Sequence, residues 1–252
     1  MHMHPIIQSL LLSLASLPAV LSAQQLRLQH IRSLSIPSDD GQQGVATDGK
    51  YLYVQNTQQL FQYNLNGKLL HASSRLTLHH GGIAWVAGKL YCAVSGCDPT
   101  GSPVQRVHVY DPTTFQLLQQ HDVSRHFSIC AGGIAYRRNH FYVAASFFDN
   151  DHMDTIVQFT AHFNHVKTYQ VPIRSPFGIQ GLEYLPDSDQ FQIHSHGKDF
   201  YRINARFDQA SLVRGKAAFD LQDLTRLDNQ TLLINHRDAA KLVFVRVLTD
   251  GR

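Results

Sequence analysis

The chain has 252 residues and a formal net charge of +3; hydrophobic residues make up 43% of it and charged residues 16%. This much apolar material excludes an intrinsically disordered chain. The lysines and arginines are scattered along the sequence, and we expect no nucleic-acid partner because such a surface needs clustered positive charge.

The first segment, residues 1–23, is typical of a secretory signal peptide. It contains no Asp, Glu, Lys or Arg, its residues 6–17 are largely apolar, and it ends in the small residues Ser22 and Ala23. An uncleaved membrane anchor is the alternative, but Pro18 and several serines interrupt the stretch, and a span needs about 20 apolar residues. We therefore expect a secreted or periplasmic protein with no membrane span after cleavage, and one domain over residues 24–252.

The rest of the chain repeats one pattern five times. The clearest copies are GGIAWVAGKLYCAVS, which begins at Gly81, and GGIAYRRNHFYVAAS, which begins at Gly132. The anchor positions of the repeats are Gly44, Gly82, Gly133, Gly181 and Asp223. They are separated by 38, 51, 48 and 42 residues, which is the length of a four-stranded blade in a β-propeller.

Each repeat predicts strands, because polar and apolar residues alternate, aromatic residues are frequent and no helical period is present. A short strand of small residues comes first, as in 83–84 and 134–135, and a β-rich strand follows a tight turn, as in 51–54 and 90–94. Glycine and alanine in the first strand would let the backbones approach one another around the axis.

The two ends of the chain predict how the ring closes. The last repeat stops after its third strand, KLVFVRVL, and residues 26–37 before the first repeat resemble an outer strand. We expect this N-terminal segment to complete the last blade and so to remove an open sheet edge. The predicted fold is an all-β, five-bladed β-propeller closed by an N-terminal strand; another blade count, such as four blades plus a hairpin, is the alternative.

Propellers usually bind ligands at the axis, on the face where the chain runs into the first strand of each blade. Glutamine recurs there at one register. The candidate ligand-binding residues are Gln43, His80, Gln180, Gln222 and His236. The entry links also place His79 and Cys130 on this face, and the loop between the second and third strands of the last repeat places Arg237 there. We expect an axial funnel that binds a small polar molecule or a peptide end; bracing of the rim by hydrogen bonds is the alternative.

Two patterns suggest a divalent metal, Zn or Ca, as cofactor. His194 and His196 alternate on a predicted strand, so both would point to one side roughly 7 Å apart, and imidazole suits Zn or Cu. Residues 147–155, FFDNDHMDT, place Asp149 and Asp151 in an oxygen-rich loop of the kind that suits Ca²⁺. A solvated loop is the alternative, because the Gly and Glu of an EF-hand are missing.

Catalytic motifs are scarce in the sequence, which has no GxSxG, HExxH or P-loop pattern. Glu183 lies on a predicted first strand and is a candidate acid or base, because burial there would raise its pKa; a structural role is the alternative. Cys97 and Cys130 are predicted on one face of neighbouring blades and could form a disulfide in an oxidising compartment, leaving Cys92 as a buried thiol.

Residues 177–184, FGIQGLEY, are similar to the FTQGL step of plant-type glutaminyl cyclases, and the HHGGI step at 79–83 looks like uncharacterised bacterial propellers. The cyclases are five-bladed propellers that convert N-terminal Gln to pyroglutamate. The resemblance implies a secreted propeller and, as one alternative function, a cyclotransferase. Where that family has ESTG, this chain has IHSHG at 193–197. A metal-dependent hydrolase or a protein-interaction module would also fit the repeat pattern, and we expect a monomer.

Overall fold

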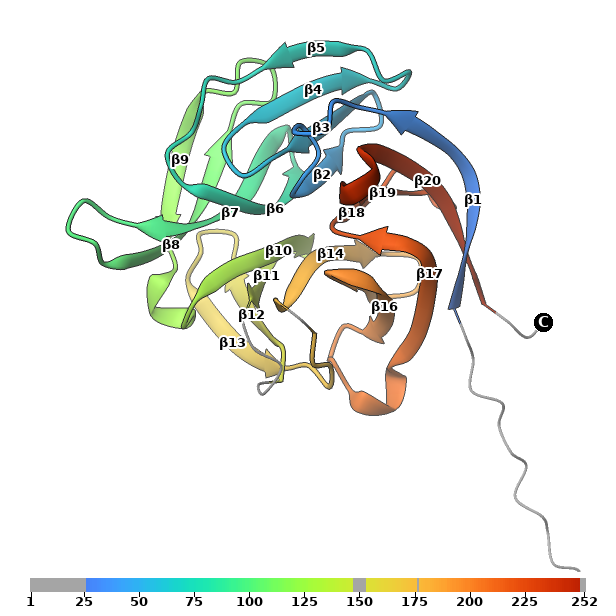
Figure 1. The fold of residues 1–252 in the computed structure, drawn as a ribbon. Coiled ribbons are helices and arrows are strands. Elements are labelled where there is room, and N and C mark those ends of the chain that lie inside the picture. Colours follow the sequence, from blue (N-terminus) through green and yellow to red (C-terminus); the bar gives the residue numbers. More distant parts are fainter. Residues whose placement is uncertain (1–25, 147–152, 176, 250–252) are drawn as a thin grey trace, which may run out of the picture.

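The computed structural model describes residues 26–146, 153–175 and 177–249, and in this part of the chain every regular element is a strand or a short 3₁₀ turn (Figure 1). The 3₁₀ turns are Ser124–His126, Gln209–Ser211 and Arg237–Ala239. The predicted all-β class is confirmed. No helix of the described residues is long and apolar enough to cross a membrane.

Three antiparallel sheets of four strands follow one another along the chain. The first consists of β2 (Gly44–Thr47), β3 (Tyr51–Gln55), β4 (Leu60–Asn64) and β5 (Leu69–Ala72). The second consists of β6 (His79–Val86), β7 (Lys89–Cys97), β8 (Pro103–Tyr110) and β9 (Leu117–Asp122). The third consists of β10 (Cys130–Arg137), β11 (His140–Ser146), β12 (Thr155–Thr160) and β13 (His165–Gln170).

The remaining strands form one sheet of eight. One half contains β14 (Ile179–Leu185), β15 (Gln190–Ser195), β16 (Gly197–Asn204) and β17 (Val213–Leu221). The other half contains β18 (Leu224–Arg226), β19 (Leu232–His236), β20 (Lys241–Thr249) and the N-terminal β1 (Leu26–Ser35). The halves join where Leu26 of β1 pairs in parallel with Gly215 of β17.

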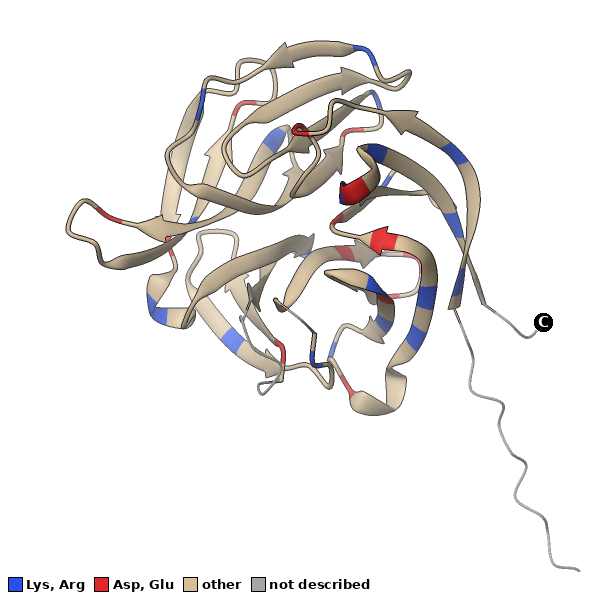
Figure 2. Cartoon of the chain, in the orientation of Figure 1, with Lys and Arg blue, Asp and Glu red and all other residues tan. Residues whose placement is uncertain are grey.

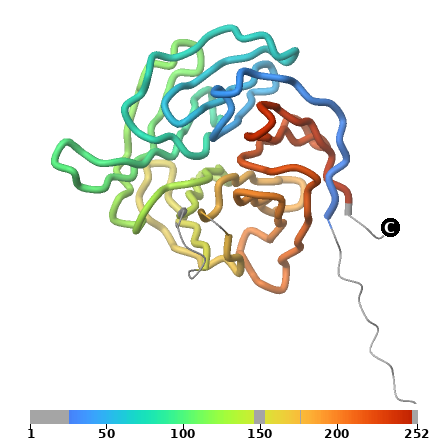
Figure 3. The backbone as a smooth tube through the Cα atoms, in the orientation of Figure 1, coloured from blue at the N-terminus to red at the C-terminus, as the bar shows by residue number. Residues whose placement is uncertain are grey.

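The N-terminal strand closes the ring, as the sequence predicts. β1 pairs with β20 in antiparallel register from Leu26↔Thr249 to Ser35↔Lys241, with one irregularity near His30. The two ends of the described chain therefore lie side by side (Figure 3). Pairing with β1 satisfies the outer edge of β20, which would otherwise expose a row of backbone hydrogen-bonding groups.

The first strands of the sheets form the centre of the ring. Each of β2, β6, β10, β14 and β18 contacts the next, and β18 contacts β2. A Cβ atom on Gly82 would lie 2.7 Å from the Cα of Gly133, and one on Gly133 would lie 2.9 Å from the nitrogen of Leu182. The repeated Gly-Gly step thus recurs because a side chain there would collide with the neighbouring backbone.

Five clusters of buried hydrophobic side chains lie between neighbouring units of this ring. Between the second and third sheets, Tyr91 contacts Phe141 with ring centroids 4.5 Å apart, and Phe141 stacks on Phe163 of its own sheet at 4.6 Å. The alternation along each strand provides these faces, because successive side chains point to opposite sides of a sheet.

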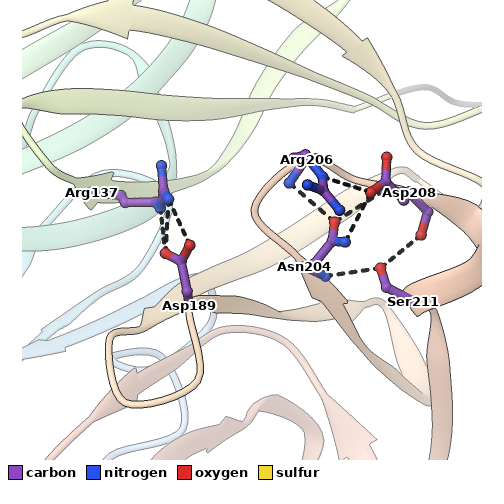
Figure 4. A network of polar contacts seen from close by, with 6 residues as sticks. All are labelled: Arg137, Asp189, Asn204, Arg206, Asp208 and Ser211. Carbon is purple, nitrogen blue, oxygen red and sulfur yellow. Dashed lines mark hydrogen bonds and ion pairs between the residues drawn. The ribbon is translucent and has the colours of Figure 1, made fainter.

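A polar tie joins the third sheet to the next unit (Figure 4). Arg137 donates from Nε and Nη2 to the two carboxylate oxygens of Asp189, at 2.9 and 2.8 Å. Tyr184 donates its hydroxyl to the same carboxylate at 2.7 Å. Apart from such pairs, Lys and Arg occur on strands all round the ring (Figure 2).

Candidate functional site

A cavity of about 460 Å³ opens where the chain runs into the first strands. We call it the axial cavity, because its lining comes from the start of every unit of the ring. The lining residues are Gln43, His79, Gly81, Cys130, Ala131, Phe177, Gln180, His196, Gln222, Arg237 and Asp238. Its size falls in the usual range for small-molecule pockets.

Three glutamines form a hydrogen-bonded cluster in the axial cavity. The Nε2 of Gln222 lies 3.3 Å from Oε1 of Gln43 and 3.4 Å from Oε1 of Gln180. Gln43 and Gln222 are buried and Gln180 is half-buried. The structure therefore brings together the three amides that the shared register singled out.

His196 is hydrogen-bonded to this cluster through one of its ring nitrogens. Its Nδ1 lies 3.0 Å from Oε1 of Gln222, and because an amide oxygen only accepts, we assign the proton to Nδ1. In the neutral ring Nε2 then carries the lone pair. Phe177, which is 48% exposed and was not expected in the site, packs edge-on against His196 at 5.6 Å.

His79, not His80, faces the axial cavity. His80 is buried inside its sheet, where Nδ1 lies 3.0 Å from the carbonyl of Leu78 and Nε2 2.9 Å from the hydroxyl of Tyr110. Burial lowers the pKa of His80 to about 4. Successive strand residues point to opposite faces, so only one of these two adjacent histidines can face the cavity. The prediction that His80 lines it was wrong, and the neighbouring His79 lines it instead.

The predicted metal pair of His194 and His196 is not formed. His194 is fully buried against Phe200, with ring centroids 5.9 Å apart, and neither of its nitrogens has a hydrogen-bond partner among the described residues. β15 ends at Ser195, and Gly197 has a φ of +117°, so strand alternation does not extend to His196. Among the described residues, no group of three His, Cys, Asp or Glu could hold a metal ion.

The other predicted site residues lie elsewhere. Glu183 is three residues beyond Gln180 on β14, where its carboxyl contacts Thr225 and burial raises its pKa to about 7. His236 packs against Phe219 at 4.9 Å and lines a lateral groove beside β1. Asp149 and Asp151 lie outside the described residues.

The predicted Cys97–Cys130 bridge is absent, and all three cysteines are free thiols. β7 continues to Cys97 instead of ending near Val94, which carries Cys97 away from the neighbouring sheet. The Cys130 thiol is hydrogen-bonded to Ser95, which lies two residues before Cys97 on β7. Two residues of a strand span roughly 7 Å, so Cys97 lies too far along the strand to pair with Cys130. Cys92 is buried, as expected.

The centre of the ring contains a carboxyl group whose role the sequence did not reveal. Asp223 takes the place of glycine in the last repeat. Its buried carboxyl accepts the backbone N–H of Val45 at 3.0 Å and of Leu224 at 2.8 Å, and it also accepts from the backbone of Ile83. Burial raises its pKa well above the usual range, and the contacts join β18 to β2 and β6.

Comparison with known proteins supports this architecture. A glutaminyl cyclase from Myxococcus xanthus superposes with a TM-score of 0.71 at 14% sequence identity, over 91% of this chain and 100% of that one. The fold is a β-propeller. A chain of the mitotic checkpoint complex (TM-score 0.48, 10% identity, 98% and 99% coverage) and the WD40 domain of Neurospora crassa Pan2 (0.42, 7%, 81% and 62%) are also similar. No protein-family model and no curated protein sequence matches the chain.

Proposed function

We propose that the protein is an exported, five-bladed β-propeller whose axial cavity binds a small uncharged polar molecule or the end of a peptide. The count of five takes the eight-stranded sheet as two blades joined at the Leu26–Gly215 pair. The five hydrophobic clusters, one between each pair of neighbouring units, support this count.

The amide cluster carries the proposal. Gln222 links Gln43, Gln180 and His196 in one network, and the amides of Gln43 and Gln222 keep further donor or acceptor capacity. Primary amides and hydroxyl groups offer the same mixture of donors and acceptors, so they would complement this lining. Phe177 adds an apolar face on which the carbon skeleton of such a ligand would pack.

The charge of the cavity favours a neutral ligand. Among the described residues that line it, Arg237 is the one basic side chain of the Lys and Arg type and Asp238 is the one acidic side chain. Catalysis by a cyclotransferase would need an acid or base at the bound substrate. Glu183, the residue expected to serve, is not among the lining residues, so it would not act on a ligand bound there.

Titration calorimetry with the dipeptide amide glutaminyl-alanine amide and with glucose tests the proposal. We expect at least one probe to bind, and Gln222→Leu to weaken its binding by about tenfold or more, because a buried hydrogen-bond network is lost. Gln119→Leu, an exposed position on β9, is the matched control and should bind normally. Unchanged binding by Gln222→Leu, failure of both probes, or conversion of the peptide to pyroglutamyl-alanine amide with release of ammonia would overturn it.

Export is the remaining part of the proposal. Residues 1–23 lie outside the described residues, and their composition supports removal after translocation. N-terminal sequencing of protein recovered outside the cytoplasm should begin at or near residue 24, and recovery of the full chain in the cytoplasm would argue against export.

A further inference from the structure

A second cavity of about 310 Å³ lies at the opposite end of the ring. Gln180 lies in the axial cavity, and Leu185, five residues later on β14, lines the second one. The rise of a strand places these positions roughly 16 Å apart. The turn at Asp187 and Ser188, between β14 and β15, also borders this cavity, so it is separate from the axial cavity.

Three arginines from three strands of the eight-stranded sheet line the second cavity: Arg202 on β16, Arg226 on β18 and Arg246 on β20. We call it the arginine cavity. The Nε of Arg202 lies 3.3 Å from the amide oxygen of Gln192, and Nη1 of Arg226 lies 2.9 Å from that of Asn229. Both partners are neutral, so these bonds do not cancel the positive charge.

Two carboxyl groups lie near the three guanidinium groups without forming ion pairs with them: Arg246 interacts electrostatically with Asp228, and Arg226 with Glu183. Within the described ranges, none of the arginines has a carboxylate oxygen within 4.0 Å. Asp228 is engaged in its own turn, where Oδ1 accepts the backbone N–H groups of Gln230 and Thr231 at 2.8 Å each. Asp187 is exposed, and burial raises the pKa of Glu183 to about 7, which leaves it partly protonated near neutral pH.

The cost of this arrangement is highest at Arg202. Its side chain is largely withdrawn from solvent, and this burial lowers the pKa of the guanidinium. Burying a charge without a counter-charge is unfavourable, and two further cations across the same cavity add repulsion. An anion with several oxygens would relieve both costs at once.

We propose that the arginine cavity binds a tetrahedral oxyanion, either phosphate or sulfate as a free ion or the same group as an ester of a larger molecule. The planar guanidinium fork matches the oxygens of these groups and can bind two of them at once. Leu185, Leu232 and Val247 line the same cavity, and they would contact the carbon part of an ester.

The test uses the full chain at fixed ionic strength near neutral pH, with sodium phosphate or sulfate compared against sodium chloride. We expect saturable binding of phosphate or sulfate in calorimetry, a rise in melting temperature, and a shift of the Arg202 Nε–H resonance in NMR. Matching the ionic strength separates specific binding from general screening. A response no larger than that to chloride would overturn the proposal.

Arg246→Gln is the informative variant, because the side chain is exposed and its loss should not disturb folding. It should weaken phosphate binding by about tenfold or more, since one charge-assisted contact is lost. Arg75→Gln removes the same charge from an exposed link elsewhere and should bind phosphate as the unaltered protein does. An equal loss in both variants would show a non-specific effect and reject the site.

Phosphoserine and glucose 6-phosphate distinguish the two sources of the anion. Binding at least about tenfold tighter than inorganic phosphate would assign the site to an ester, and equal binding would assign it to the free ion. Weakening of the esters by Arg246→Gln is required in either case. Because Gln222→Leu alters the other end of the ring, it should leave phosphate binding intact even if the axial cavity binds nothing.

Discussion

His194 and Asp223 are ionisable side chains whose charged forms are disfavoured by burial. Burial lowers the pKa of His194 to about 3 and raises that of Asp223 well above its usual range. The two differ in their surroundings, because Asp223 accepts backbone hydrogen bonds while His194 has no partner among the described residues. The carboxyl of Asp223 therefore stabilises the centre of the ring, whereas the unpaired ring nitrogens of His194 cost free energy of folding.

Replacing His194 by Leu should remove the free-energy cost of its unpaired ring nitrogens. It should also remove the dependence of folding stability on pH that this histidine causes. The unfolded histidine takes up a proton below about pH 6.5, while the folded one stays neutral until about pH 3, so stability due to the neutral ring is lost as pH falls through this window. Relative to His194→Leu, the unaltered protein should lose about 2 kcal/mol of unfolding free energy between pH 7.5 and pH 5. Urea unfolding of both proteins at the two pH values measures the difference.

Phe200→Leu is the control for that experiment, because it alters packing against the same ring without removing the titrating group. It should destabilise the protein equally at both pH values. A His194→Leu variant whose stability falls with pH in parallel with that of the unaltered protein would contradict the assignment of a neutral buried imidazole.

Register explains which site residues could be predicted. Gln43 and Gln222 precede the first strands of their units and Gln180 lies at the start of β14, and the structure places the three amides together. The pairing of β6 with β7 is irregular between His80 and Ile83, and sequence alternation does not reveal which of two adjacent histidines a β-bulge turns inward. Phe177 lies before a strand in the left-handed region, at a φ of +64°, and no sequence period reports its direction.

At the scale of elements, β1 is the strand on which closure depends. It covers the outer edge of β20, and Arg32 lies 3.7 Å from the centre of the Phe244 ring. The strand could be predicted because the last repeat lacked a fourth strand. The extension of β7 to Cys97 could not, because Gly96 and Cys97 have no strand preference of their own and pair through the β7–β8 hairpin.

Deleting residues 26–35 should make the protein aggregate and abolish its cooperative unfolding. The deletion uncovers the edge of β20 and removes the buried side chain of Leu26, and an open edge pairs readily with other chains. Thermal unfolding by circular dichroism and gel filtration measure the outcome. A synthetic peptide of residues 26–37 should restore part of the transition. A deleted protein that stays monomeric and melts at the original temperature would refute the role of β1.

At the scale of the whole molecule, the ring has a different cavity at each end and one seam between its first and last strands. The axial cavity gathers amides, and the arginine cavity gathers cations. The axial cavity is lined from every unit of the ring, whereas the arginine cavity is lined only from the eight-stranded sheet and its turns. The seam is the β1–β20 ladder, and elsewhere the neighbouring units meet mainly through side chains.

A circular permutant isolates the contribution of that seam. Joining residues 249 and 26 by a short linker and opening the exposed link at residues 74 and 75 leaves every strand in place, because Leu26 and Thr249 are already paired. The permutant should keep its circular dichroism spectrum but unfold about tenfold faster or more, since its new ends are not held by a strand ladder. Unfolding rates in denaturant measure this, and an unchanged rate would show that the side-chain clusters alone hold the ring.

The position of the paired ends also determines how the molecule resists a force that pulls its two termini apart. Leu26 and Thr249 leave the β1–β20 ladder at the same corner, so a pull on the two termini loads the backbone bonds one after another, as in opening a zipper. Strands pulled along their length would instead share the load among all their bonds. A machine that drags on either terminus would therefore peel off β1 or β20 first and open the ring at its seam, although the same ladder protects the sheet edge in the absence of force.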